Sequence, residues 1–147
     1  QPVGESVSAW VLASLDSHKL MRLGAIPELE GTGGGALCKT MTLAKLHQPG
    51  DLAEGERRLT RYSDSDLNGH VNNTRYADFA CDALEMEKLP GDRFLAELQI
   101  GYLAECRPGE VLSIQAGGQG DSRFVRGVDL EGKPRFESAL FFGETPF

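Results

Sequence analysis

Carboxylate, amide and imidazole side chains alternate in the stretch that joins the first clear strand of the chain to its helix. Residues 63–76 read Ser-Asp-Ser-Asp-Leu-Asn-Gly-His-Val-Asn-Asn-Thr-Arg-Tyr. Asp66, Asn68 and His70 are two positions apart, so on an extended segment their side chains would point to the same side. Such a group of side chains could position a water molecule or polarise a carbonyl.

The predicted start of a helix follows this segment directly. N–H groups near Val71, Asn72 and Asn73 would be unpaired there, and with the positive end of the helix dipole they can stabilise an oxyanion. Asp, Asn and Gly also populate ordinary turns. The same residues can therefore form only a polar turn and a helix cap, and the spacing leaves both interpretations open.

A second candidate segment lies at the end of a later predicted strand. Alternating apolar residues end at Cys106, so Glu105 would face the opposite side of that strand. A carboxylate there can deprotonate water, although an acidic residue at a strand end is more often solvated. Cys106 is either a buried structural thiol or a nucleophile. Because adjacent strand residues point to opposite faces, only one of the two can be the main catalytic group.

Two further motifs are incomplete. The run Asp64–Gly69 imitates the first half of a calcium loop, but Arg75 stands at the twelfth position, where that loop needs Glu. Residues 33–40 end in Lys-Thr, yet Cys38 replaces the glycine that precedes the lysine in a phosphate-binding loop. We therefore expect no metal and no nucleotide or other organic cofactor.

The elements that must position these side chains follow in a regular order. Residues 57–62 form a predicted strand, and one long helix is predicted from an N-cap at Asn72 or Asn73 to the turn at residues 90–92. The apolar stripe of this helix consists of Tyr76, Phe79, Ala80, Ala83 and Leu84. Four strands are predicted next, in an antiparallel meander, at residues 94–106, 111–117, 123–129 and 134–143. A single sheet that buries one helix stripe gives an α+β domain.

The first 56 residues are less regular. Residues 6–15 are rich in Val, Ala and Trp and read as a buried strand. Glycine and proline clusters then indicate a linker with one short strand around residues 38–46. The N-terminus has no basic region and does not begin with Met, so we expect a cut or processed end and no signal peptide.

Composition narrows the class of protein. The 147 residues are about one domain long, and the longest apolar run is far short of the roughly 20 residues that span a bilayer. Three cysteines without metal-type spacing indicate reduced thiols in a cytoplasmic protein. The net charge of −7, with scattered basic residues, would repel a phosphate backbone and makes nucleic acid an unfavourable partner.

Three segments together resemble the acyl-acyl-carrier-protein thioesterases of the hotdog superfamily. The run Asp66–Tyr76 resembles the family signature, and Tyr102–Cys106 resembles its second catalytic segment, which carries Glu-Cys after a Tyr. Ser8–Leu12 resembles the strand that ends the N-terminal hotdog repeat. The resemblance implies a hotdog domain over residues 57–147, an antiparallel sheet wrapped around one long central helix. Residues 1–56 would be the last strand of a preceding repeat and a linker.

The resemblance also implies an activity, which is hydrolysis of fatty acyl thioesters on acyl carrier protein to free fatty acid and thiol, in fatty acid biosynthesis. Matched position by position, the catalytic set is Asp66, Asn68, His70 and Glu105. We expect Glu105 to be the base for an attacking water, and Asn68 and His70 to position water or carbonyl. Asp66 would orient one of them or attack directly, and Cys106 is the alternative nucleophile.

Two other functions remain open, an acyl-CoA thioesterase of a single-hotdog branch and a non-catalytic acyl-binding or dimerisation module.

Acyl carrier protein is acidic, so an acidic enzyme needs a local basic patch to bind it. Arg57, Arg58 and Arg61 are candidates, although an exposed strand edge explains them equally well.

Because most of a first repeat is missing, we expect a homodimer in which Trp10 and Val11 are buried.

Overall fold

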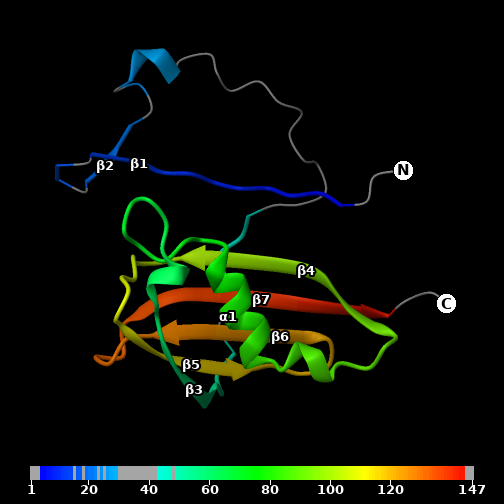
Figure 1. Cartoon of the computed structure of the whole chain (residues 1–147). Helices are drawn as coiled ribbons and strands as arrows, with labels where there is room; N and C mark the ends of the chain where they lie inside the picture. The colour runs from blue at the N-terminus through cyan, green and yellow to red at the C-terminus, as the bar shows by residue number, and fades with distance from the viewer. Residues whose placement is uncertain are drawn as a thin grey trace. The chain divides into compact units, whose positions relative to one another are not determined.

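A computed structural model describes residues 4–14, 16–17, 19–22, 24, 26–29, 43–47 and 49–144. The chain divides into two compact units, Gln1–Lys45 and Leu46–Phe147, which are described separately. Figure 1 shows the elements of both units. All candidate catalytic residues belong to the second unit.

The first unit contains a short two-stranded ribbon. Strand β1 (Leu12–Ala13) pairs antiparallel with β2 (Leu20–Met21), and a 3-10 turn, η2, covers Pro27–Leu29. The prediction of a buried strand over residues 6–15 is wrong, because Trp10 is 80% exposed and, within the described residues 6–14, only Leu12 and Ala13 are in a strand. An isolated two-stranded ribbon is only marginally stable and has no second layer against which to bury side chains. The strand predicted around residues 38–46 lies mostly outside the described residues, and 43–47 are not in a strand.

The second unit is built on a five-stranded antiparallel sheet with the order β3-β5-β6-β7-β4. The strands are β3 (Ala53–Leu59), β4 (Arg93–Tyr102), β5 (Val111–Gly117), β6 (Ser122–Val128) and β7 (Pro134–Glu144). The bounds of β5, β6 and β7 lie within about one residue of the prediction. Strand β4 ends four residues before the predicted end, and β3 begins and ends a few residues before the predicted strand. The α+β class is confirmed.

The predicted four-strand meander is correct only for β5, β6 and β7. Strand β4 pairs with β7 at the edge of the sheet and does not neighbour β5. The connection of residues 103–110 is longer than a tight hairpin turn, so the chain returns past two strands before β5 begins. This connection carries Glu105 and Cys106.

Helix α1 (Arg75–Ala83) lies across one face of the sheet (Figure 1). Its stripe is the predicted one, since Tyr76, Phe79 and Ala80 are buried. The helix ends before the predicted turn because Glu85 has a left-handed φ of 50°, and a 3-10 turn, η4 (Met86–Lys88), follows. The N-cap is Thr74, one or two residues later than predicted.

The core lies between this stripe and the facing side of the sheet. Phe79 is fully buried, and its ring packs against Tyr76 with centroids 5.8 Å apart. Burial of one such side chain stabilises the fold by about 1.5–3 kcal/mol. Val71 and Cys106 belong to the same cluster, so the two loops that carry the candidate residues are both anchored in the core.

Candidate active site

The segment from Asp66 to His70 is a tight turn. The N–H of Asp66 donates to the carbonyl of His70 (2.9 Å), and the N–H of Gly69 donates to the carbonyl of Asp66 (3.1 Å). Gly69 has a φ of 75°, a conformation that costs glycine little. The prediction that Asp66, Asn68 and His70 share one side of an extended segment is therefore wrong in its geometry, because the segment folds back on itself.

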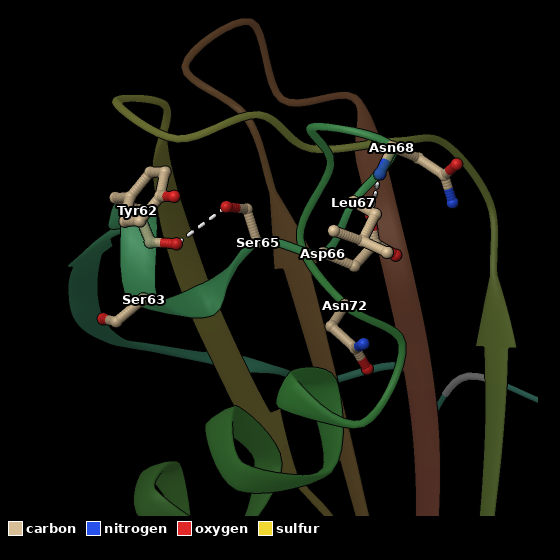
Figure 2. A pocket seen from close by; sticks show the side chains of 7 residues that line it. All are labelled: Tyr62, Ser63, Ser65, Asp66, Leu67, Asn68 and Asn72. Atoms are coloured by element: carbon tan, nitrogen blue, oxygen red, sulfur yellow. Dashed lines mark hydrogen bonds between the residues drawn. The ribbon is translucent and has the colours of Figure 1, made fainter.

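The side chain of Asp66 supports this turn from within. Its Oδ1 accepts a hydrogen bond from the backbone N–H of Asn68 at 2.8 Å, which is the geometry of an Asx turn. The side chain of Asn68 is exposed and points away from Asp66 (Figure 2). Asp66 thus orients the main chain of Asn68, and the amide of Asn68 faces solvent.

A backbone hydrogen bond joins the two candidate segments. The N–H of Val71 donates to the carbonyl of Cys106 at 2.8 Å, and both side chains are buried in the core. Because each of these residues follows a candidate residue, the bond brings His70 and Glu105 side by side. His70 Nε2 lies 3.1 Å from Glu105 Oε2.

The pair of His70 and Glu105 is open to solvent. The Glu105 side chain is 58% exposed and that of His70 is 23% exposed. Pairs of this kind in water contribute only about 0–1 kcal/mol to stability. The contact therefore adds little to the stability of the fold, and both groups remain accessible to water.

Cys106 has the opposite environment. Its side chain is completely buried, and desolvation raises the pKa of the thiol above its ordinary value. The hydroxyl of Tyr76 contacts this thiol, and burial likewise raises the pKa of Tyr76. Residues 103–106 were predicted to continue strand β4, but the strand ends at Tyr102. Glu105 and Cys106 nevertheless lie in different environments, as expected, because the first is exposed and the second is buried.

The backbone N–H groups at the helix start are largely occupied. Val71 donates to Cys106, Asn72 donates to the carbonyl of Asp64 (2.8 Å), and the side chain of Asn72 accepts the N–H of Thr74. Among the described residues, the N–H of Asn73 has no partner. The predicted oxyanion site of three N–H groups is thus reduced to Asn73 in this structure, because two of them hold the loops together.

An open hollow of about 610 Å³ lies beside the same turn (Figure 2). Two exposed apolar side chains, Tyr62 and Leu67, border it. The rest of its lining is polar and consists of Ser63, Ser65, Asp66, Asn68 and Asn72. His70 and Glu105 do not line this hollow. We place the candidate active site at the pair, because an imidazole and a carboxylate in contact can serve as acid and base. We regard the hollow as a neighbouring surface.

Sequence reasoning missed Arg135. Its guanidinium Nη1 donates to the carbonyl of Glu105 at 2.5 Å, and its Nε lies 3.1 Å from Asp129 Oδ2. No sequence motif marks this arginine, since its place beside Glu105 follows from the pairing of β7 with β4.

The described residues contain no cluster of three or more His, Cys, Asp or Glu side chains with the geometry of a metal site. Within the same described part of the chain, no helix is long and apolar enough to cross a membrane.

Comparison with solved structures identifies the class of fold. An acyl-ACP thioesterase from Bacteroides thetaiotaomicron matches 89% of this chain with a TM-score of 0.69 at 19% identity. A hypothetical protein from Staphylococcus aureus, solved in complex with CoA, matches 63% of the chain (75% of its own) with a TM-score of 0.55 at 16% identity. A 1,4-dihydroxy-2-naphthoyl-CoA thioesterase from Synechocystis also matches 63% (83% of its own), with a TM-score of 0.53 at 16% identity. The predicted hotdog fold is confirmed.

The sequence identifies the family within that fold. The acyl-ACP thioesterase C-terminal domain family matches residues 52–131, which is more than half of the 147 residues. The chain therefore belongs to this family, as predicted. It covers 53% of the length of the Bacteroides protein. None of the curated proteins compared with the chain matches it.

Proposed function

We propose that this chain carries the catalytic half of a thioesterase that hydrolyses fatty acyl-acyl-carrier-protein in fatty acid biosynthesis. The observation that carries the proposal is the 3.1 Å contact between His70 Nε2 and Glu105 Oε2. Both residues lie within the segment that matches the thioesterase family. An imidazole and a carboxylate in contact, open to solvent, can activate a water molecule without a cofactor.

In the proposed reaction, Glu105 takes a proton from water while the water oxygen attacks the thioester carbonyl. A tetrahedral oxyanion forms, the C–S bond then breaks, and the thiolate leaves with the proton that Glu105 had accepted. The products are a free fatty acid and the carrier thiol. His70 holds the carboxylate of Glu105, and the exposed amide of Asn68 positions water or carbonyl.

The proposed oxyanion donor is the backbone N–H of Asn73, which has no partner among the described residues. Preorganised N–H donors of this kind stabilise charge that develops in the transition state. Asp66 acts indirectly, because its carboxylate already accepts the N–H of Asn68. Its role is to keep the turn in place.

Cys106 fits the role of nucleophile poorly. A nucleophilic cysteine needs a thiolate and access to the substrate. The thiol of Cys106 is fully buried and its pKa is raised by desolvation, so it stays protonated near neutral pH. We assign it to the core.

The acyl carrier is proposed to bind through exposed arginines of the second unit. Arg58 already has partners within the fold. Its Nη1 lies 2.6 Å from Asp82 Oδ2, and its guanidinium stacks 4.2 Å from the Phe79 ring centroid. Arg57 and Arg61 are exposed and have no ion pair within the described residues. Of the three predicted cations, these two can meet an acidic carrier protein.

The second half of the site is proposed to come from another hotdog repeat. We propose that residues 57–147 are the thioesterase domain, and that residues 1–56 are the end of a preceding repeat with a linker. The site is open, and a neighbouring repeat would exclude water from it. We also propose that a second copy of the chain can be this neighbour, in a homodimer. The two described cysteines, Cys81 and Cys106, are free thiols, consistent with the proposed cytoplasmic location.

The test is an assay of one fatty acyl group presented on acyl carrier protein and on coenzyme A. We expect hydrolysis of both thioesters and a higher kcat/KM on the carrier protein. A higher kcat/KM on coenzyme A would favour the single-hotdog acyl-CoA thioesterase instead. Saturable binding of both thioesters without hydrolysis would favour a non-catalytic acyl-binding module.

A further inference from the structure

Arg135 is bound to the segment that carries Glu105 through both its main chain and its side chain. Its carbonyl accepts the N–H of Leu103 (2.9 Å) and of Ala104 (3.1 Å). Its guanidinium donates from Nη1 to the carbonyl of Glu105 at 2.5 Å. Three consecutive residues that leave strand β4 are therefore held by one residue at the start of strand β7.

The guanidinium is itself fixed from the other side by Asp129. Its Nε lies 3.1 Å from Asp129 Oδ2, and the Asp129 side chain is only 10% exposed. Asp129 Oδ1 accepts the N–H of Glu131 (3.1 Å) and of Lys133 (2.8 Å) in the turn between β6 and β7. The bond from Lys133, with help from Arg135, lowers the pKa of the Asp129 carboxyl, so this anchor stays charged.

A second carboxylate faces the same guanidinium. Glu110 Oε2 lies 3.9 Å from Arg135 Nη2, is buried, and accepts no hydrogen bond within the described part of the chain. A buried carboxylate oxygen without a hydrogen bond is costly unless a cation compensates it. Arg135 thus stands between Asp129 and Glu110, which restricts where its Nη1 can point.

We infer that Arg135 is a positioning residue that sets the place of the Glu105 carboxylate against His70. The carbonyl of Glu105 is held by Arg135, and the next carbonyl, that of Cys106, is held by the N–H of Val71. With the main chain held on both sides, the carboxylate of Glu105 is kept within reach of His70, 3.1 Å from Nε2. The catalytic meaning of this rests on the proposed function, whereas the positioning itself is measurable without substrate.

The test is the nuclear magnetic resonance signal of the His70 ring nitrogens in the full chain labelled with ¹⁵N. The His70 signal is assigned with His70→Gln, and Glu105→Gln gives the signal of His70 without its carboxylate partner. We expect Arg135→Gln to move the His70 signal toward that of Glu105→Gln. The other two histidines, His18 and His47, are internal references.

Arg93→Gln is the matched control. Arg93 also bridges two carboxylates, Asp121 and Glu144, with a side chain 20% exposed. It is the first residue of β4 and pairs with the end of β7 that is opposite Arg135. This variant should leave the His70 signal unchanged. If Arg135→Gln does not fold, Arg135→Lys replaces it, because a single ammonium keeps the charge but cannot reach both Asp129 and Glu105.

A folded Arg135 variant with the His70 signal of the unaltered chain would overturn the inference. In the thioesterase assay, Arg135→Gln should lower kcat roughly 10–100-fold with KM within about twofold, as expected for misplacement of a reacting group. A shifted His70 signal in a chain that hydrolyses no thioester would leave the positioning role in place and reject the proposed function.

Discussion

Glu105 and Cys106 are adjacent in the sequence, yet the fold gives them opposite environments. The Glu105 side chain is 58% exposed and contacts His70, whereas Cys106 is completely buried against Tyr76. The carboxylate can exchange protons with water, and the thiol cannot ionise without a desolvation cost. We therefore expect substitution of these two residues to affect turnover differently.

Glu105→Gln should lower turnover by roughly 10²–10⁴-fold, the usual contribution of a general base. Cys106→Ala should keep most of the turnover per folded molecule, although it leaves a small cavity and lowers stability. Both variants are compared by kcat on the same acyl thioester, with circular dichroism to establish the folded fraction. A large loss in Cys106→Ala together with a small loss in Glu105→Gln would make Cys106 the nucleophile.

At the scale of elements, a glycine of one strand leaves room for the aromatic ring of the neighbouring strand. Gly127 of β6 faces the ring of Phe136, and an added Cβ would lie only 2.3 Å from a ring carbon. Phe136 is fully buried and cannot move aside. Gly101 of β4 is different, because its added Cβ would make only ordinary contacts at 3.9 Å.

Gly127→Ala should therefore lower the free energy of unfolding by about 1–3 kcal/mol, the usual cost of overpacking a core. Gly101→Ala is the matched control and should be neutral or slightly stabilising, since alanine reduces the entropy of the unfolded chain. Urea unfolding followed by circular dichroism gives both values. Equal stabilities for the two variants would contradict the close packing of Phe136 on β6.

The elements were largely predictable from sequence, and their pairing was not. Turn signals such as Gly117-Gly118 and Glu131-Gly132 separate β5 from β6 and β6 from β7, and the helix stripe around Phe79 follows from its spacing. Nothing local shows that β4 pairs with β7. The contact between His70 and Glu105 depends on a hydrogen bond between residues 35 positions apart in sequence, so sequence could supply the candidates but not the geometry.

At the scale of the whole molecule, the chain covers about half of the Bacteroides acyl-ACP thioesterase. Its proposed site is open, and its first unit exposes Trp10 (80%) and Val11 (75%). Contiguous exposed apolar surface is typical of sites that bind another chain, and these two adjacent side chains are candidates for such a contact. A two-fold dimer would bury them and supply a neighbouring repeat for each site.

We therefore predict a homodimer in solution. Light scattering should give twice the mass of one chain, and fluorescence of Trp10, the only tryptophan, should shift to shorter wavelength as concentration rises. Val11→Asp should weaken association, whereas Leu130→Asp, at another exposed apolar position, should leave it unchanged. A well-folded monomer at all concentrations would reject the dimer and favour a natural partner of a different sequence.

The central claim is that His70 and Glu105 act as one catalytic unit, and a double-mutant cycle tests it most directly. The hydrolysis rate of acyl-acyl-carrier-protein is measured for the unaltered chain, His70→Gln, Glu105→Gln and the double variant. When two groups act as one catalytic unit, removal of either group removes most of the rate that both provide, so the second substitution adds little. We predict that each single variant loses most of the activity and that the double variant is hardly slower than Glu105→Gln. Losses that multiply in the double variant would show two independent residues and contradict the account.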